Sequence, residues 1–344
     1  MSDCDIRPMH DDEFNKVQAL YKAAFHKEIN PVYWQWKYHE NPHGRTVRMV
    51  AVAGDRLVGF YGLIPRKFMV DGQVLVGHQE TDLMVHPEWR GIKIFRSMGL
   101  ACYRRLMEDG YTFTFGFPNQ QSTPAGTKVL GWELVCPMPI WNRYLRPGYI
   151  LRRKGIPLVP GMIDGAVGVV GSLTGRSGRY KDIAIVDRLP GDPARLETAP
   201  TQDSMIRGLR DAAYLQWRYR QPVDTPYLFA VKGDESAPAG LAVFRIMPGE
   251  PREAWVLELI GPNRAVTSEL LAAVTEACRQ RRVEVIRLWL LEGGAASRTP
   301  PGTGYKLRPT TIHHVIRPLE DAHVNSLIRR AGNWSITIGD SDCV

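Results

Sequence analysis

The chain of 344 residues carries one sequence pattern twice, and this repeat constrains the fold more than any other feature. The hexapeptide YWQWKY at residues 33–38 recurs as YLQWRY at residues 214–219. The segment VAVAGD at residues 50–55 recurs, in the same order, as FAVKGD at residues 229–234. Because the copies lie roughly 180 residues apart, far more than the unit of a solenoid, we interpret the repeat as a duplicated domain.

Each copy reads as an alternation of helices and strands. Apolar residues recur at helical spacing between Phe14 and Phe25, and Gly54-Asp55 is a hairpin signal between two apolar runs. The expected elements of the first copy are helices at residues 11–26, 94–108 and 121–130 and strands at residues 48–52, 56–65, 67–70, 73–76, 79–85 and 111–117. Those of the second copy are strands at residues 228–231, 239–246, 254–259 and 283–291 and a helix at residues 267–281. This order predicts an α/β fold.

A strand, a basic glycine turn and an amphipathic helix follow one another between residues 79 and 108, with Arg90-Gly91 in the turn. The first N–H groups of a helix have no internal partner and carry partial positive charge. A phosphate group satisfies both deficits, so we expect an anion site at the start of this helix, near Ile94.

The segment Val-His-Pro-Glu-Trp-Arg-Gly at residues 85–91 resembles the acyl-CoA loop of the GNAT superfamily of N-acyltransferases. That loop usually reads Arg/Gln-x-x-Gly-x-Gly/Ala. Arg90 matches its first position, whereas Lys93 and Phe95 stand where the family has small residues. The resemblance implies two tandem GNAT-like domains, each a mixed, mostly antiparallel sheet flanked by helices. The residues implied to bind acyl-CoA are Met84, Val85, Arg90, Gly91, Ile92, Lys93, Ile94, Phe95 and Asn119.

The two copies differ at the position of this loop. The second copy reads Gly261-Pro262-Asn263 there and has no Arg-Gly turn. We therefore expect an acyl-CoA-binding N-terminal domain at residues 1–145, a connecting segment at residues 146–200, and a C-terminal GNAT-like domain without the CoA loop at residues 201–344.

The catalytic base is sought on the strand at residues 79–85. Glu80 and Asp82 share one face by the strand period of two, and two neighbouring carboxylates could hold one proton at a raised pKa. Both are candidates, and Glu80 is preferred. A β-bulge, frequent here in the family, would change this facing. The position that resemblance assigns to a general acid is Thr127, a poor acid, so the acid stays unassigned.

Composition limits the ligand and the compartment. A formal charge of +8 with scattered basic residues fits an anionic co-substrate better than nucleic acid. The five cysteines include no Cys-x-x-Cys pair, so we expect neither a disulfide framework nor a metal site. No signal peptide or membrane-spanning segment is expected; residues 156–173 are read as a poor membrane helix and alternatively as a surface flap. These features favour a cytoplasmic protein.

The expected activity is acyl-CoA-dependent N-acyl transfer, most simply from acetyl-CoA to a primary amine, with an amino sugar of surface-polysaccharide biosynthesis as a possible acceptor. Alternatives are aminoacyl, peptide or longer-chain N-acyl transfer, or a non-catalytic sensor of CoA or nucleotide. Tyr33, Trp34, Trp36 and Tyr38 are expected to form core or interdomain packing, with a ligand shelf near the acceptor as the alternative. Asp340 and Asp342 are read as part of a frayed tail, or else as a site for a cationic acceptor. The oligomeric state is not predicted.

Overall fold

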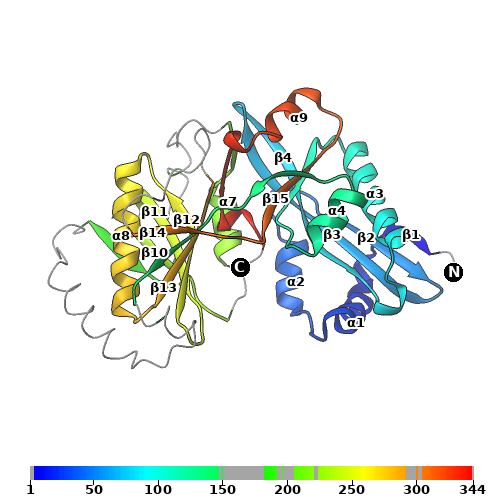
Figure 1. Ribbon diagram of the computed structural model, residues 1–344, viewed down its shortest axis with the longest axis horizontal. Helices are drawn as coiled ribbons and strands as arrows, with labels where there is room; N and C mark the ends of the chain where they lie inside the picture. The colour runs from blue at the N-terminus through cyan, green and yellow to red at the C-terminus, as the bar shows by residue number, and fades with distance from the viewer. Residues whose placement is uncertain are drawn as a thin grey trace.

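The computed structural model describes residues 4–146, 149, 182–191, 196, 205–220, 224–291, 300 and 304–342. Residues 156–173, for which a surface flap or a membrane-contacting segment is the alternative interpretation, lie outside this part of the chain. The described residues form an α/β fold of two halves that lie side by side (Figure 1). Within the described part, no helix combines the length and the apolar character needed to cross a membrane.

The N-terminal half is a sheet with helices on both faces. Helices α1 (Phe14–Phe25) and α2 (Pro31–Tyr38) share one core cluster with the sheet, and α3 (Ile92–Glu108) packs in another cluster on the opposite face. The short helix α4 (Ser122–Val129) follows. The strands are β1 (Asp5–Pro8), β2 (Val47–Ala53), β3 (Arg56–Val70), β4 (Gln73–Val85), β5 (Phe113–Gly116) and β6 (Glu133–Pro137). The breaks expected near Pro65 and residues 77–78 do not occur, because β3 and β4 pair through both points as one long hairpin.

The C-terminal half repeats this plan. Its strands are β8 (Ile183–Val186), β10 (Leu228–Asp234), β11 (Ala237–Ile246), β12 (Glu253–Ile260), β13 (Val285–Leu291) and β14 (Tyr305–Arg308). Helix α8 (Arg264–Gln280) covers one face, where Leu270, Leu271, Val274 and Cys278 join the core, as its apolar spacing predicts. Helix α7 (Ala212–Tyr219), which carries the second copy of the aromatic hexapeptide, lies towards the N-terminal half (Figure 1).

The two halves exchange one strand each, which the sequence analysis did not anticipate. Strand β7 (Ile140–Tyr144) leaves the N-terminal half and pairs between β13 and β14. Strand β15 (His313–Pro318) leaves the C-terminal half and pairs between β5 and β6. The sheet of each half therefore contains one strand from the other half. Boundaries at residues 145 and 201 consequently do not separate the strands of one sheet from those of the other.

Two short strands join the half-sheets into one. Strand β9 (Ile206–Gly208) pairs with the end of β3, and β16 (Trp334–Thr337) pairs with both β9 and β13. The described strands thus form a single 16-stranded sheet. Helix α9 (Ala322–Ile328) precedes β16, and the 3₁₀ turn η5 (Ile338–Asp340) follows it. The final described residues, drawn in red, consequently run between the halves (Figure 1).

Candidate active site

The parallel strands β4 and β5 separate in the middle of the N-terminal half. They pair at His78 with Thr114 and at Gln79 with Phe115, and no pairing between them continues beyond these residues. Past this point β4 stays paired with β3, while β5 stays paired with β15 as far as Gly116. One edge of β4 from Glu80 onward is therefore turned towards the separation rather than towards another strand.

The backbone of Val85 points into this separation. The His86 N–H donates to the Val58 carbonyl over 2.8 Å, and opposed residues of an antiparallel pair alternate between hydrogen-bonded and non-bonded. Met84 opposes Phe60 in a bonded pair, and Val85 opposes Gly59 in a non-bonded pair. The Val85 N–H is thus available to a ligand in the separation, whereas the Met84 N–H is turned to β3.

A β-bulge interrupts β4 next to these residues. Phe60 pairs with Met84 but Gly62 pairs with Thr81, so Asp82 and Leu83 together oppose Tyr61. Asp82 adopts a positive φ of 34°, a backbone conformation uncommon outside glycine. The extra residue shifts the strand period, and the expectation that Glu80 and Asp82 share a face is wrong.

Glu80 faces α3. Its Oε1 accepts hydrogen bonds from the Tyr103 hydroxyl (2.9 Å) and from the Thr114 hydroxyl, and the Trp132 indole N–H donates to the Tyr103 hydroxyl (2.8 Å). Its Oε2 is closed to solvent and has no hydrogen-bond partner in the described part of the chain. Burial raises the pKa of Glu80 to about 7, although the Thr114 and Tyr103 hydrogen bonds oppose the rise. Glu80 can therefore exchange a proton near neutral pH.

Asp82 lies on the opposite face, against α2. It accepts hydrogen bonds from the Lys37 ammonium (2.7 Å) and the Tyr38 hydroxyl (2.6 Å), and its side chain keeps 33% exposure. Burial raises the pKa of Asp82, but the attraction of Lys37 outweighs burial and leaves this pKa below its usual value. Asp82 is therefore a stable anion at neutral pH and not a partner of Glu80 in a shared proton.

Lys37 connects Asp82 to the end of the chain. Its ammonium also contacts Asp342 over 2.8 Å, and the Gln79 side-chain amide donates to the same carboxylate over 2.6 Å. Burial disfavours the charged form of Lys37, but Asp342 and Asp82 overcome that penalty and hold its pKa well above the ordinary value. The carboxylates thus keep a buried cation ionised beside the bulge.

The expectation of a frayed tail is wrong for the described residues that end the chain. Asp340 is buried and pairs with Arg66 (3.1 Å) and Arg210 (2.6 Å). Ser341 is also buried, and its carbonyl accepts a hydrogen bond from Arg218. This segment is part of the interface between the halves.

The start of α3 lacks a side-chain cap. Its N-cap residue is Gly91, which follows the 3₁₀ turn η2 (Pro87–Trp89). A Cβ atom built on Gly91 would meet no atom within 4 Å, so the corner is open. Arg90 is exposed, and its side chain has no partner among the described residues. These features fit an anion such as a diphosphate, with the helix N–H groups as donors.

Lys93, Ile94, Phe95 and Asn119, the other residues implied to bind acyl-CoA, differ in the groups that they can offer to a ligand. Lys93 is exposed, Ile94 is buried and Phe95 packs against the α3 core, so Ile94 and Phe95 can offer backbone N–H groups only. Asn119 is exposed, but its Oδ1 accepts hydrogen bonds from the backbone N–H groups of Gln121 and Ser122. Asn119 thus has its side-chain NH₂ group left for a ligand.

The corresponding region of the C-terminal half is filled by the chain itself. Strands β12 and β13 pair as far as Val256 and Leu288, and β16 then pairs with β13 at Leu290 and Leu291. The turn η5 contacts both β12 and β13. The start of α8 is capped by the Asn263 side chain, which accepts from the Val266 N–H over 3.1 Å. Neither the strand separation nor the helix start is therefore open in this half.

Sequence reasoning missed several side chains that the fold brings to this region. Lys37 and Tyr38 lie within the repeated hexapeptide, from which we expect packing by the aromatic residues and no role for Lys37. Tyr103, in the middle of α3, donates a hydrogen bond to Glu80. Trp132, which follows α4, donates in turn to the Tyr103 hydroxyl. The spacing of α3, which puts Tyr103 one turn after Gly99 on the core face, was the available signal. Among the described residues no group of three His, Cys, Asp or Glu side chains is placed to hold a metal.

Comparison with known proteins gives a match to one domain and a shared fold. Residues 5–135 match the acetyltransferase (GNAT) domain. A GCN5-related N-acetyltransferase from Anabaena variabilis superposes with a TM-score of 0.64 at 12% identity, covering 94% of this chain and 74% of that one. A probable N-acyltransferase of unknown function from Enterococcus faecalis gives 0.61 at 14% identity, covering 93% and 73%. At these identities the two structures show a shared fold. No curated protein matches the sequence.

Proposed function

Because residues 5–135 belong to the GNAT superfamily, we propose that the chain is an acyl-CoA-dependent N-acyltransferase, most simply one that transfers acetyl to a primary amine. The observation that carries this proposal is the contrast between the halves. The N-terminal half leaves open both the start of α3 and the separation of β4 from β5. The C-terminal half closes both equivalents with its own residues. We therefore propose one acyl-CoA site per chain.

The proposed site holds acyl-CoA at three places. The diphosphate lies on the N–H groups of Ile92, Lys93, Ile94 and Phe95, where Arg90 and Lys93 supply positive charge. The pantetheine arm enters between β4 and β5, within reach of the Asn119 amide. The Val85 N–H, turned away from β3, donates to the thioester carbonyl and to the oxyanion that develops from it.

Two carboxylates take different roles in the proposed reaction. Asp82, a partly exposed anion, attracts the acceptor as an ammonium ion, together with Asp342. Glu80, with a pKa of about 7, accepts the proton that the ammonium must lose. The free amine then forms a C–N bond to the carbonyl carbon, the C–S bond breaks, and the second proton lost by the nitrogen passes through water to the CoA thiolate.

An amino sugar is the first acceptor we propose to test, and a peptide or aminoacyl amine is the second. Release of free CoA thiol should be followed with acetyl-CoA and a longer acyl-CoA against both acceptor classes. Thiol release that depends on an amine would support acyl transfer and identify its class. Tight acetyl-CoA binding with no thiol release from any amine would instead favour a non-catalytic sensor.

A further inference from the structure

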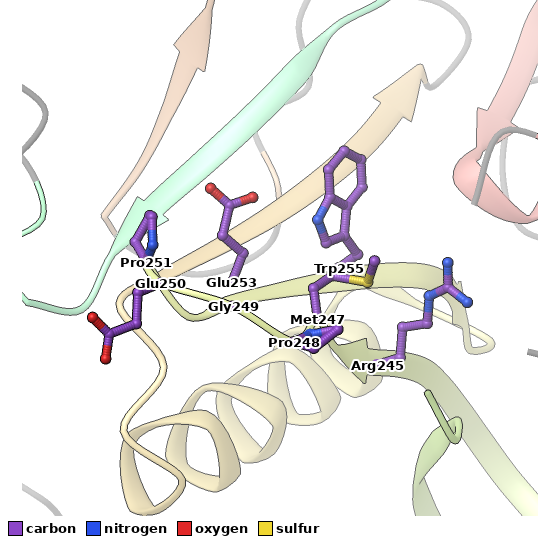
Figure 2. Close-up of a pocket in the computed structure, with 8 residues that line it drawn as sticks. All are labelled: Arg245, Met247, Pro248, Gly249, Glu250, Pro251, Glu253 and Trp255. Atoms are coloured by element: carbon purple, nitrogen blue, oxygen red, sulfur yellow. The ribbon is translucent and has the colours of Figure 1, made fainter. Parts of the chain in front are cut away.

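The C-terminal half contains a pocket that the proposed reaction does not use. It has a volume of about 390 Å³ and lies at the hairpin between β11 and β12 (Figure 2). Its lining includes Arg245, Met247, Pro248, Pro251, Glu253 and Trp255. The pocket therefore combines apolar surface with ionisable side chains, a combination typical of small-molecule sites.

Arg245 is a buried cation without a counterion in the described part of the chain. It is 7% exposed, and among the described residues its Nε has no hydrogen-bond partner and no carboxylate forms an ion pair with it. Its described contact is with the ring of Tyr227, whose centroid lies 5.6 Å from the guanidinium carbon. A buried charge is costly unless it is paired, so this side chain is left with an unmet requirement for an anion.

A second buried arginine, Arg210, differs from Arg245 because it forms ion pairs with carboxylates. Arg210 contacts Asp340 over 2.6 Å and Glu258 over 3.1 Å. These carboxylates overcome the effect of burial and hold the pKa of Arg210 well above its usual value. Burial lowers the pKa of Arg245 instead, because no comparable anion faces it. Arg245, which lines the pocket, thus differs from Arg210 in having no carboxylate partner among the described residues.

The carboxylates nearby do not supply that anion. Glu253 is held by Arg287 through two hydrogen bonds of 2.7 and 2.6 Å, which neutralise its charge. Glu250 is exposed at the rim of the hairpin. Arg245 is consequently the cation of the pocket that is available to bind an anion.

An aromatic surface lies beside the arginine. Arg245 and Trp255 are direct cross-strand partners and so share one face of the sheet. Figure 2 shows the side chains of Arg245, Glu253 and Trp255 rising from the same side of the hairpin, with Pro251 close to Glu253. A flat group can stack on the indole while its substituent approaches the guanidinium.

We propose that this pocket binds a ligand in which an anionic group, a carboxylate or a phosphate, is attached to a flat apolar body. Arg245 pairs with the anion, and Trp255 packs against the apolar body. The site does not depend on acyl transfer, and the closed strand separation and capped α8 of this half distinguish it from the acyl-CoA site.

The test uses simple probes on the full chain. Benzoate and phenyl phosphate carry both features, whereas benzyl alcohol lacks the charge and inorganic phosphate lacks the ring. Calorimetric titration should show at least one aromatic anion binding roughly tenfold more tightly than both partial probes. The difference between benzoate and phenyl phosphate then assigns the preferred anion.

Matched variants locate the binding. Arg245→Met should weaken the aromatic anion roughly tenfold, while Arg252→Met, which removes an exposed arginine of the same hairpin, should leave its affinity within about twofold. Acetyl-CoA affinity and the melting temperature report whether each variant is folded. The proposal is overturned if the unmodified protein prefers neither aromatic anion, or if both arginine variants behave alike.

Discussion

Trp36 and Trp217, equivalent residues of the two sequence repeats, stack on each other with ring centroids 4.5 Å apart and an interplanar angle of 10°. The Trp36 indole N–H donates to the Trp217 carbonyl over 2.8 Å, and the Trp217 indole N–H donates to the Trp36 carbonyl over 2.9 Å. The reciprocal contact places an approximate two-fold axis between α2 and α7. The duplicated hexapeptide thus joins the halves by pairing with its own copy.

Removing either indole should weaken the fold. We expect Trp36→Ala and Trp217→Ala each to lower the free energy of unfolding by about 3 kcal/mol, because stacking, burial and a hydrogen bond are lost together. The double variant should cost about 2 kcal/mol less than the sum, as measured by chemical denaturation. Trp89, which packs in the core cluster of α3, provides the control: Trp89→Ala combined with Trp36→Ala should be additive. Additivity of the Trp36 and Trp217 variants would contradict the reciprocal contact.

Lys37 should hold the last described residues of the chain against the bulge in β4. Lys37→Met leaves Asp82 and Asp342 without their shared cation, and we expect a loss of about 3 kcal/mol at neutral pH. The Asp82 pKa is lowered and the Lys37 pKa is raised in the folded state. The pair therefore stabilises the fold above the ordinary Asp value of 3.8 and below the ordinary Lys value of 10.5, and this stabilisation is lost as the pH moves outside that window.

Denaturation of both proteins across the pH range tests this interpretation. The difference between unmodified protein and Lys37→Met should shrink as the pH falls and the carboxylates take up protons. Lys22→Met, which removes an exposed lysine paired with Glu28, should leave the stability close to that of the unmodified protein, because solvent screens an exposed ion pair. A Lys37→Met difference that stays constant down to acid pH would mean that lost packing, rather than lost charge pairing, causes the effect.

Glu80→Gln should lower acyl transfer by about 100-fold while leaving the affinity for acetyl-CoA within twofold. In the unmodified enzyme, kcat/KM should rise with pH around an apparent pKa of about 7, because the Glu80 carboxylate is the active form. Exposed Glu108 gives a matched control, and Glu108→Gln should retain full activity. Full activity of Glu80→Gln would exclude Glu80 as the base.

The same raised pKa predicts how stability depends on pH. Between the ordinary value of 4.5 and about 7, the folded state keeps a proton on Glu80 that the unfolded chain releases. The stability of the unmodified protein should therefore fall, relative to Glu80→Gln, as the pH rises through this window, and level off above it. Paired denaturation curves at pH 4.5, 6 and 8 measure the difference; a constant difference would place the Glu80 pKa near its ordinary value.

Local pattern predicted much of the scaffold. The recurring segments indicated the duplication. Apolar periodicity, which acts over a few residues, predicted the helices that are observed as α1 and α8, and turn chemistry predicted the hairpin at Gly54-Asp55. The exchange of β7 and β15 could not be read in this way. An apolar strand fits either sheet, and the sequence of Ile140–Tyr144 does not say which partner it will have.

For the candidate site, the sequence predicted which segment carries the residues but not how their side chains are arranged. Glu80, Asp82 and Arg90-Gly91 do surround one strand end and one helix start. The bulge at Asp82 reversed the facing of the carboxylates, because one added residue changes the side of every later side chain. The contacts of Lys37 with Asp342 span 305 residues and arise from tertiary packing, for which the local pattern contains no signal.

Calorimetric titration with acetyl-CoA tests the central claim, that the N-terminal half alone holds the co-substrate at the start of α3. We predict one site per chain, an affinity roughly tenfold weaker in Arg90→Ala, and unchanged affinity in Arg104→Ala, which removes an exposed arginine further along α3. Asn263→Ala, which uncaps α8, should also leave the affinity unchanged. Two sites per chain, or equal affinity in Arg90→Ala and Arg104→Ala, would contradict the account.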